Sequence, residues 1–161
     1  MVSYQWRDKM KAVIQRVSRA SVTVDGELVS QIKKGYMILL GVMDDDTRED
    51  AEILAKKTST LRVFEDDEGK MNLDIKQVDG EILAISQFTL CADVKKGNRP
   101  SFIRSAPPTD ANELYEYFCD KLLENGVKNV YKGVFGADMK VDLLNDGPVT
   151  ILYDSELWRK K

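Results

Sequence analysis

Hydroxyl and amide side chains follow one another in Ser86-Gln87-Phe88-Thr89, directly after an apolar segment that begins at Ile82. Polar residues where a buried strand ends often belong to functional sites, because they meet loops beside a rigid sheet. The Thr89 hydroxyl is a candidate nucleophile, although such a group needs an adjacent base. Alternatively, Ser86 and Thr89 only satisfy neighbouring backbone groups. The segment therefore predicts one wall of a site and leaves the part of Thr89 in the chemistry open.

The chain contains no histidine among its 161 residues. This excludes Ser-His-Asp and Cys-His catalysis as well as histidine-ligated zinc, and it removes the usual acid-base side chain near neutral pH. The two cysteines, Cys91 and Cys119, form no C-x-x-C pair and are predicted to be reduced and buried. We expect no metal and no cofactor. Chemistry would then depend on carboxylates, lysines, backbone dipoles or the substrate itself.

The segment GVFGADM, residues 133–139, places an aromatic ring between two glycines. Glycines allow the backbone to come close to another group. Phe135 beside the polarizable Met139 could hold a nucleobase. Packing in the core is the more common role for both side chains, so the segment alone does not decide between the two.

The segment NDGPVT, residues 145–150, is rich in turn-forming residues. Because proline cannot donate to a sheet ladder, Pro148 is expected at the first position of a strand. We predict a hairpin here, with one strand over residues 139–144 and the next over 149–153. The sequence itself does not indicate whether the bond between Gly147 and Pro148 is cis.

A basic segment lies between residues 95 and 104, although the net charge of the whole chain is −3. An acidic average argues mildly against a nucleic-acid partner, but a local patch can override it. A solvated loop is the alternative interpretation. The segment holds four cations and no acid: Lys95, Lys96, Arg99 and Arg104.

The length predicts one domain, and the order of elements predicts a mixed α/β domain. We expect mostly antiparallel β-sheets layered with two helices on one side. Strands are predicted at 11–24, 28–32, 36–42, 82–90, 139–144 and 149–153, and helices begin near residues 47 and 107. Residues 1–9 are expected to form an N-terminal extension, and residues 10–161 the domain. No secretory signal or membrane-spanning run is visible, so a cytoplasmic protein is expected.

From Met10 onward the chain resembles the D-aminoacyl-tRNA deacylases. The resemblance covers nearly the whole length, and only the first nine residues and the last four lie outside it. The segments that carry it are KAVIQRVSRASVTVDGE, GYMILLGV, LRVFEDDEGKMNL, SQFTL, KGNRPSF, APP, GVFGADM and NDGPVT.

The resemblance implies a homodimer that hydrolyses the ester between a D-amino acid, and also glycine, and the 3′ end of tRNA. By this likeness Ser86 to Thr89 form a wall of the pocket, and Phe135 and Met139 surround the terminal adenine. Gly147-Pro148, held cis, would reach in from the partner subunit and reject L-amino acids. The tRNA 2′-hydroxyl would assist catalysis.

The same likeness makes the basic segment a set of tRNA phosphate contacts, at Lys95, Lys96, Arg99 and Arg104. Aminoacylated tRNA and a second copy of the chain are the expected partners, with no membrane. Two other interpretations remain open: a deacylase with Thr89 as covalent nucleophile, and a dimer that binds nucleic acid without catalysis.

Overall fold

The computed structural model describes residues 8–159. Of the predicted N-terminal extension, residues 1–7 lie outside the described part. The remaining residues are Asp8 and Lys9, and Lys9 contacts the domain twice. Its backbone N–H donates to Asp154 Oδ1 at 3.1 Å, and its ammonium lies 3.0 Å from Asp45. Met10 is completely buried.

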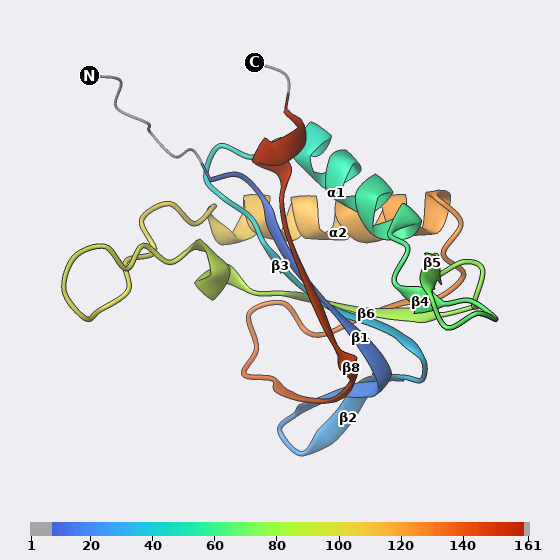
Figure 1. Cartoon of the computed structure of the whole chain (residues 1–161). Coiled ribbons are helices and arrows are strands. Elements are labelled where there is room, and N and C mark those ends of the chain that lie inside the picture. Colours follow the sequence, from blue (N-terminus) through green and yellow to red (C-terminus); the bar gives the residue numbers. More distant parts are fainter. Residues whose placement is uncertain (1–7, 160–161) are drawn as a thin grey trace.

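One six-stranded sheet forms the centre of the molecule (Figure 1). Its long strand β1 pairs antiparallel with β2 and β3 along one edge and with β8 along the other. The sheet continues through two parallel pairings, β3 with β6 and β6 with β7. The strands are β1 (Lys11–Val24), β2 (Glu27–Ile32), β3 (Gly35–Gly41), β6 (Glu81–Ser86), β7 (Val130–Lys132) and β8 (Lys140–Asp154).

The strands predicted at 11–24 and 28–32 are confirmed, and a hairpin turn at Asp25-Gly26 joins them. Both residues have positive φ, 50° and 80°, which is what the tight turn between antiparallel strands requires. The sheet also curls until its end strands β2 and β7 meet, where the Ser30 hydroxyl donates to the Lys132 carbonyl at 2.6 Å.

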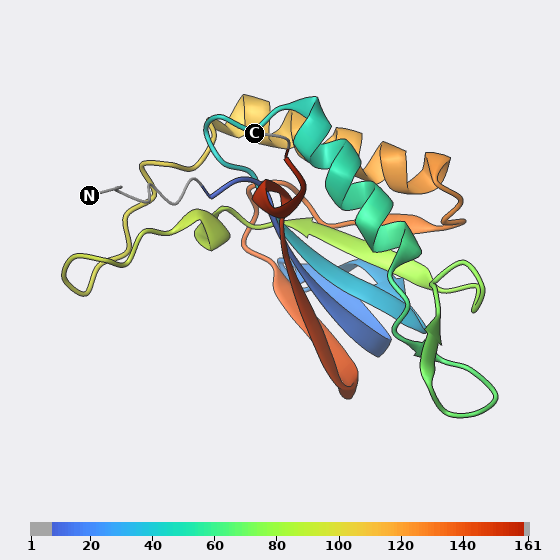
Figure 2. The same cartoon turned by 45° about the horizontal axis from the view of Figure 1, so that its top comes forward.

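Both long helices cover the same face of the sheet, as Figures 1 and 2 show. Helix α1 (Arg48–Thr60) begins with a capping box between Thr47 and Asp50, and α2 (Pro108–Glu124) begins with proline in its first turn. The remaining elements are the small hairpin β4 (Phe64–Glu65) and β5 (Met71–Leu73) and the short 3₁₀ helices η1 (Phe88–Cys91) and η2 (Ser155–Trp158).

The sheet separates two hydrophobic cores. The larger lies under the helices and includes Ile38, Leu54 and Phe118. The smaller lies on the opposite, concave face and includes Val22 and Leu83. This arrangement confirms the predicted mixed α/β domain with two helices on one side. In residues 8–159 no helix is long and apolar enough to cross a membrane.

The hairpin predicted at NDGPVT is wrong. Residues 140–154 form one continuous strand, β8, and both of its halves pair with β1. The register shifts between Gln15 and Arg19, where β8 bends sharply (Figure 2). The turn-forming residues therefore make a corner within a strand, because the bulged strand β1 supplies a partner on both sides of it.

Candidate active site

The strand predicted to run to Leu90 ends four residues earlier, at Ser86. The backbone N–H of Gln87 still donates to the Leu40 carbonyl at 2.8 Å, and η1 then begins at Phe88. Gly41 makes this packing possible, because a Cβ there would lie only 2.8 Å from Leu90 Cβ. The prediction of a strand over residues 82–90 is therefore wrong for Phe88 and Thr89, which belong to the 3₁₀ helix.

The turn into η1 separates Thr89 from the residues before it. Ser86, Gln87 and Phe88 line a cavity of about 570 Å³, and Thr89 does not. Thr89 is exposed, and its hydroxyl makes no hydrogen bond within residues 8–159. No base lies beside it to activate it as a nucleophile.

The cavity also contains the predicted aromatic residue Phe135 and the predicted Met139. Two distant segments of the sequence thus meet in one site. Its other walls come from the residue after β3, from the start of α2, and from the end of the loop over residues 92–105 that precedes α2. The full lining is Val42, Ser86, Gln87, Phe88, Phe102, Ser105, Ala106, Pro107, Pro108, Ala111, Phe135, Gly136, Ala137 and Met139.

Aromatic and thioether groups shape the cavity. Phe88 is 55% exposed, and its ring meets that of Phe102 edge to face, with centroids 5.0 Å apart. Met139 packs on Gly133, where a Cβ would lie 2.5 Å from the Met139 sulfur. Phe102 and Gly133 are site residues that the sequence analysis did not assign.

None of the residues that line the cavity has an ionisable side chain. Such a cavity suits a flat, uncharged ring, with the Ser86 hydroxyl and the Gln87 amide as its polar wall. It offers no side chain that could act as a general base at neutral pH. In the described part of the chain no cluster of acidic or sulfur ligands could hold a metal ion.

Both cysteines are free and buried, as predicted. The Cys91 thiol donates to the Val42 carbonyl at 3.4 Å, and burial raises its pKa to about 11. Burial also raises the pKa of Cys119 to about 12. Neither sulfur is a thiolate at neutral pH, so neither is a nucleophile.

Gly147 and Pro148 lie outside this cavity. They form the exposed corner of β8, and the bond between them is cis. The corner lies opposite Arg16 on β1, whereas Ser86 pairs with Leu40, next to Ala12. Four residues along the strands and three strand spacings across the sheet separate the two sites by roughly 20 Å.

Arg16 holds the corner from beneath and is only 5% exposed. Its Nε donates to the Asp146 carbonyl at 2.9 Å, and its Nη1 donates to the Val63 carbonyl at 2.5 Å. From above, the Val149 N–H donates to Asn145 Oδ1 at 2.8 Å. Arg16 was not assigned a role from the sequence, although strand alternation with Ala12 and Ile14 places it on the buried face.

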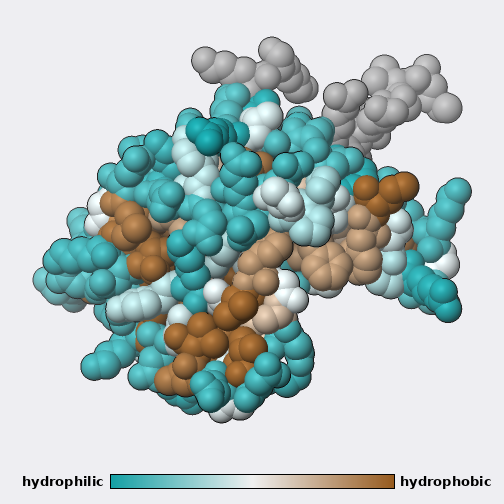
Figure 3. All heavy atoms as spheres, turned by 180° about the vertical axis from the view of Figure 1, so that it is seen from behind, coloured by the Kyte–Doolittle hydropathy of each residue, from teal (hydrophilic) through white to brown (hydrophobic). Residues whose placement is uncertain are grey.

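The long loop, residues 92–105, projects from the sheet beside the cavity (Figure 1). Two hydrogen bonds between Asp93 and Ser101 close it, at 2.7 and 2.8 Å. Beyond them Lys95, Lys96 and Arg99 are exposed and form no ion pair within residues 8–159. Figure 3 shows that the most apolar surface of the reverse face gathers at the lower middle of the view, and that a paler apolar band extends from it toward one side.

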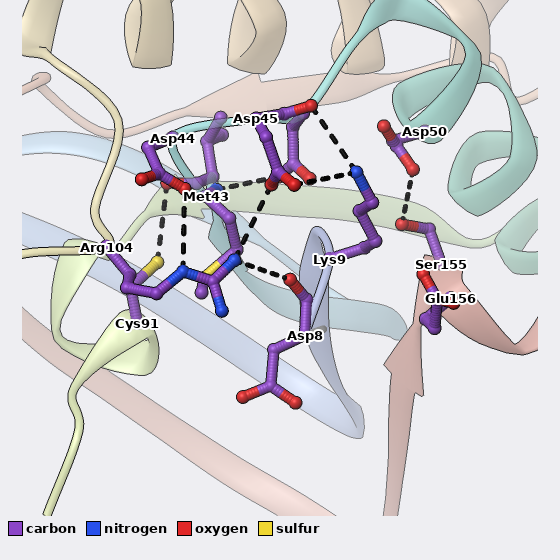
Figure 4. Close-up of polar contacts among 12 residues, drawn as sticks. Asp8, Lys9, Met43, Asp44, Asp45, Asp50, Cys91, Arg104, Ser155 and Glu156 are labelled. Atoms are coloured by element: carbon purple, nitrogen blue, oxygen red, sulfur yellow. Dashed lines mark hydrogen bonds and ion pairs between the residues drawn. The ribbon is translucent and has the colours of Figure 1, made fainter. Parts of the chain in front are cut away.

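Arg104 differs from the other three predicted phosphate contacts. Its guanidinium lies 3.6 Å from Asp44 and 3.6 Å from Asp45, and Nη2 donates to the Asp8 carbonyl at 3.2 Å (Figure 4). The structure thus brings Arg104 to the base of the loop, among acids of the turn between β3 and α1.

Comparison with known proteins gives the same family throughout. The family model described as D-Tyr-tRNA(Tyr) deacylase matches residues 13–154. The D-aminoacyl-tRNA deacylase of Anaeromyxobacter dehalogenans is 56% identical over 146 residues, which cover 91% of this chain and 97% of the relative. That of Phocaeicola vulgatus is 57% identical over 147 residues, with coverage of 91% and 98%.

Solved structures share the fold. One titled "c-Myc DNA Unwinding Element Binding Protein" is 44% identical, with a TM-score of 0.84 over 89% of this chain and 97% of that one. One titled as a probable eukaryotic D-amino acid tRNA deacylase has a TM-score of 0.77 over 90% and 98%, at 18% identity. The match over residues 13–154 and the identities above 50% show that the chain belongs to the D-Tyr-tRNA(Tyr) deacylase family.

Proposed function

We propose that this protein is an enzyme that hydrolyses the ester between a D-amino acid and the 3′-terminal adenosine of tRNA. Family membership supports the reaction class. The observation that supports placing the reaction at this site is the cavity, which combines an aromatic pocket with a polar wall and has no ionisable side chain.

The terminal adenine would bind between Phe135 and Met139. A base–aromatic stack contributes about 1–3 kcal/mol, and the thioether adapts to the edge of the ring. Gly133 supports this placement, because it lets the Met139 sulfur lie against the strand end instead of filling the cavity.

The chemistry would come largely from the substrate. With no base in the cavity, the 2′-hydroxyl of the terminal adenosine is the nearest group able to assist the attack on the ester. Ser86, Gln87 and the backbone at the start of η1 would orient the ester and stabilise the negative charge that develops on its carbonyl oxygen. Neither a metal nor a cofactor is required for this scheme.

Selection against L-amino acids would come from Gly147 and Pro148 of a partner subunit. Mirror-image substrates offer the same groups, so discrimination needs a rigid obstacle to one of them. Main-chain carbonyls in this corner would accept hydrogen bonds from the α-ammonium group and occupy the volume of an L side chain. Glycine has no side chain to exclude, so glycyl-tRNA is a further proposed substrate.

The corner would enter a pocket only in a homodimer, which we therefore propose as the active form. In one chain the corner is exposed and roughly 20 Å from the cavity, while Arg16 and Asn145 fix its shape. Strand β8 also has a free edge and carries Leu144 and Leu152, which are 49% and 72% exposed. An exposed edge with large apolar residues is a surface that another chain can cover.

The tRNA backbone would contact the tip of the long loop. Lys95, Lys96 and Arg99 are exposed and unpaired within the described residues, and they lie on the loop from which Phe102 and Ser105 line the cavity. Arg104 differs from them, because Asp44 and Asp45 engage its guanidinium. We place the enzyme in the cytoplasm, where aminoacylated tRNA is made and used.

The test is a direct comparison of D-tyrosyl-tRNA and L-tyrosyl-tRNA, with loss of the ester followed for each. We expect rapid hydrolysis of the D substrate only. Equal hydrolysis of both would contradict the proposed selection.

A second candidate is a dimer that binds nucleic acid without catalysis. The name of the structural relative with 44% identity, a DNA unwinding element binding protein, favours it, as do the exposed cations of the loop. In the same experiment such a protein would bind both tRNAs and hydrolyse neither.

A further inference from the structure

We infer that Arg104 is a positioning residue, which holds Phe102 in the cavity through Asp44 and Asp45 and does not contact tRNA phosphate. We call this set of three charged residues the Arg104 clamp. The inference rests on the proposed function, because it concerns how the same cavity receives its substrate.

The clamp joins two segments that are distant in the sequence. Arg104 comes from the return of the long loop, and both acids come from the turn between β3 and α1. The charged contacts measure 3.6 Å to each acid, and the Asp44 N–H also donates to the Arg104 carbonyl at 2.8 Å. Figure 4 shows the guanidinium between these acids and the Asp8 carbonyl.

The acids are themselves held in place. The Lys9 ammonium lies 3.0 Å from Asp45. Partial burial opposes ionisation of Asp45, but the hydrogen bond and charge of Lys9, together with Arg104, hold its pKa below the usual value. Asp45 is therefore charged at any pH near neutral and available to Arg104.

The clamp acts on the cavity through two residues close to Arg104 in the sequence. Phe102 and Ser105 both line the cavity, and the Ser105 N–H donates to the Phe102 carbonyl at 3.0 Å. The Phe102 ring in turn meets Phe88 at 5.0 Å. Fixing Arg104 thus fixes the aromatic wall that Phe102 and Phe88 form together.

The charge balance at Arg104 argues against a phosphate contact. Two carboxylates and a carbonyl surround its guanidinium, so an approaching phosphate would meet repulsion from Asp44 and Asp45. Its side chain is also only 33% exposed, whereas the cations at the tip of the loop are open to solvent.

The two roles predict opposite effects when the acids are neutralised. If Arg104 is a positioning residue, the double variant Asp44→Asn/Asp45→Asn should raise KM for D-aminoacyl-tRNA by about threefold to tenfold. Arg104→Met should do the same, and the triple variant should be no worse than either. If Arg104 binds phosphate, removing the acids should release it and lower KM.

A short substrate gives a second, independent comparison. A D-aminoacyl ester of adenosine fills the cavity but has no acceptor stem. Loss of the clamp should raise KM for this ester as much as for tRNA, while kcat changes little. Lys95→Ala is the matched control, because it removes one cation from the same loop and should raise KM for tRNA only.

Arg104→Lys completes the design, because a lysine keeps the charge and should restore part of the lost affinity. Thermal unfolding of each variant separates a local effect from misfolding. A lower KM in the acid double variant, or an effect of Arg104→Met confined to tRNA, would overturn the inference. An unmutated protein that hydrolyses neither substrate would instead refute the proposed function.

Discussion

At the scale of single residues, the position of Thr89 bears most directly on the mechanism. The change from strand to 3₁₀ helix after Ser86 turns Thr89 out of the cavity. Its exposed hydroxyl has no partner among the described residues. A covalent mechanism through Thr89 would therefore need a rearrangement of η1.

We expect Thr89→Ala to keep most of the activity, within about threefold of the unmutated enzyme, because in the proposed mechanism the substrate supplies the assisting hydroxyl. Loss of a true nucleophile usually costs several orders of magnitude. D-aminoacyl-tRNA that ends in 2′-deoxyadenosine should resist hydrolysis even by the unmutated enzyme. An inactive Thr89→Ala variant that leaves the deoxy substrate reactive in the unmutated enzyme would reverse this assignment.

Gly147 is the residue at which the preference for D-amino acids should be most sensitive. Its φ is +142°, and a Cβ would lie 2.7 Å from Val149 Cγ2. Gly147→Ala should therefore shift the corner and reduce the D-over-L ratio of kcat/KM by about tenfold or more. Rates with D- and L-tyrosyl-tRNA measure this ratio.

Gly69→Ala is the matched control for that change. Gly69 also has a positive φ, +76°, but no atom within 4 Å of an added Cβ, and it lies in the loop between β4 and β5, outside the corner of β8. It should cost some stability and leave the D-over-L ratio unchanged. An equal loss of selectivity in both variants would show that backbone strain alone is responsible.

Some residue roles follow from the sequence, and others depend on contacts that it does not display. The alternation along β1 is enough to put Arg16 on the buried face. Nothing in the sequence near Arg104 indicates that Asp44 and Asp45, about sixty residues earlier, neutralise it. That pairing exists only because the long loop returns to the end of β3.

At the scale of elements, the turn between β3 and α1 holds an unusual carboxyl group. Asp46 Oδ2 accepts from the Met43 N–H at 2.6 Å, while Oδ1 is buried without a partner among residues 8–159. Burial, assisted by the charges of Asp50 and Asp45, raises the pKa of Asp46 to about 7. The folded turn is therefore more stable when the Asp46 carboxyl group is protonated.

This pKa predicts how stability depends on pH. The unfolded chain loses the Asp46 proton near pH 4 (about 3.9), and the folded protein keeps it to about pH 7. The stabilisation from the protonated group is complete below about pH 4 and is lost as the pH rises through about 7. Asp46→Asn should therefore reduce the fall in Tm between pH 5 and pH 8.

Asp45→Asn provides the comparison, since the pKa of Asp45 is shifted downward. Its ionised form stabilises the fold above its unfolded pKa, so this variant should lose stability almost equally at pH 5 and pH 8. An unchanged pH profile for Asp46→Asn would mean that Asp46 is ionised in the folded protein.

Elements with local signals were the ones predicted well from the sequence. The Asp25-Gly26 turn, the Thr47 cap and the proline at the start of α2 each act within a few residues. The hairpin at NDGPVT was predicted wrongly because the same turn-forming residues also suit a bulged corner. Only β1, some 130 residues earlier, decides between the two by pairing with both halves of β8.

At the scale of the whole molecule, the net charge of −3 is an average that does not reveal the proposed tRNA-binding cations of the long loop. Lys95, Lys96 and Arg99 lie at the tip of one loop, in which Asp93 is the single acid. This tip is therefore the surface at which we expect contacts with phosphate.

Salt dependence tests this surface. The logarithm of KM for D-aminoacyl-tRNA should rise with the logarithm of salt concentration, and Lys95→Ala/Lys96→Ala should lower that slope by about two. Lys33→Ala/Lys56→Ala makes the same change in net charge at exposed sites on other elements. Equal slopes in the two double variants would mean that the long loop does not contact phosphate.

The distance between the corner of β8 and the cavity has a genetic consequence. If each pocket takes its corner from the other chain, a chain with a defective corner and a chain with a defective cavity can rescue each other. In a mixed dimer both defects fall on one pocket, and the other pocket receives two intact halves. A purified Gly147 variant has lost D-over-L preference, and a purified Ser86-Gln87 variant has lost activity. Mixing the two should then restore part of the D-selective hydrolysis. Two defective alleles expressed in one cell should likewise complement each other, and they would not do so if each chain built its site alone.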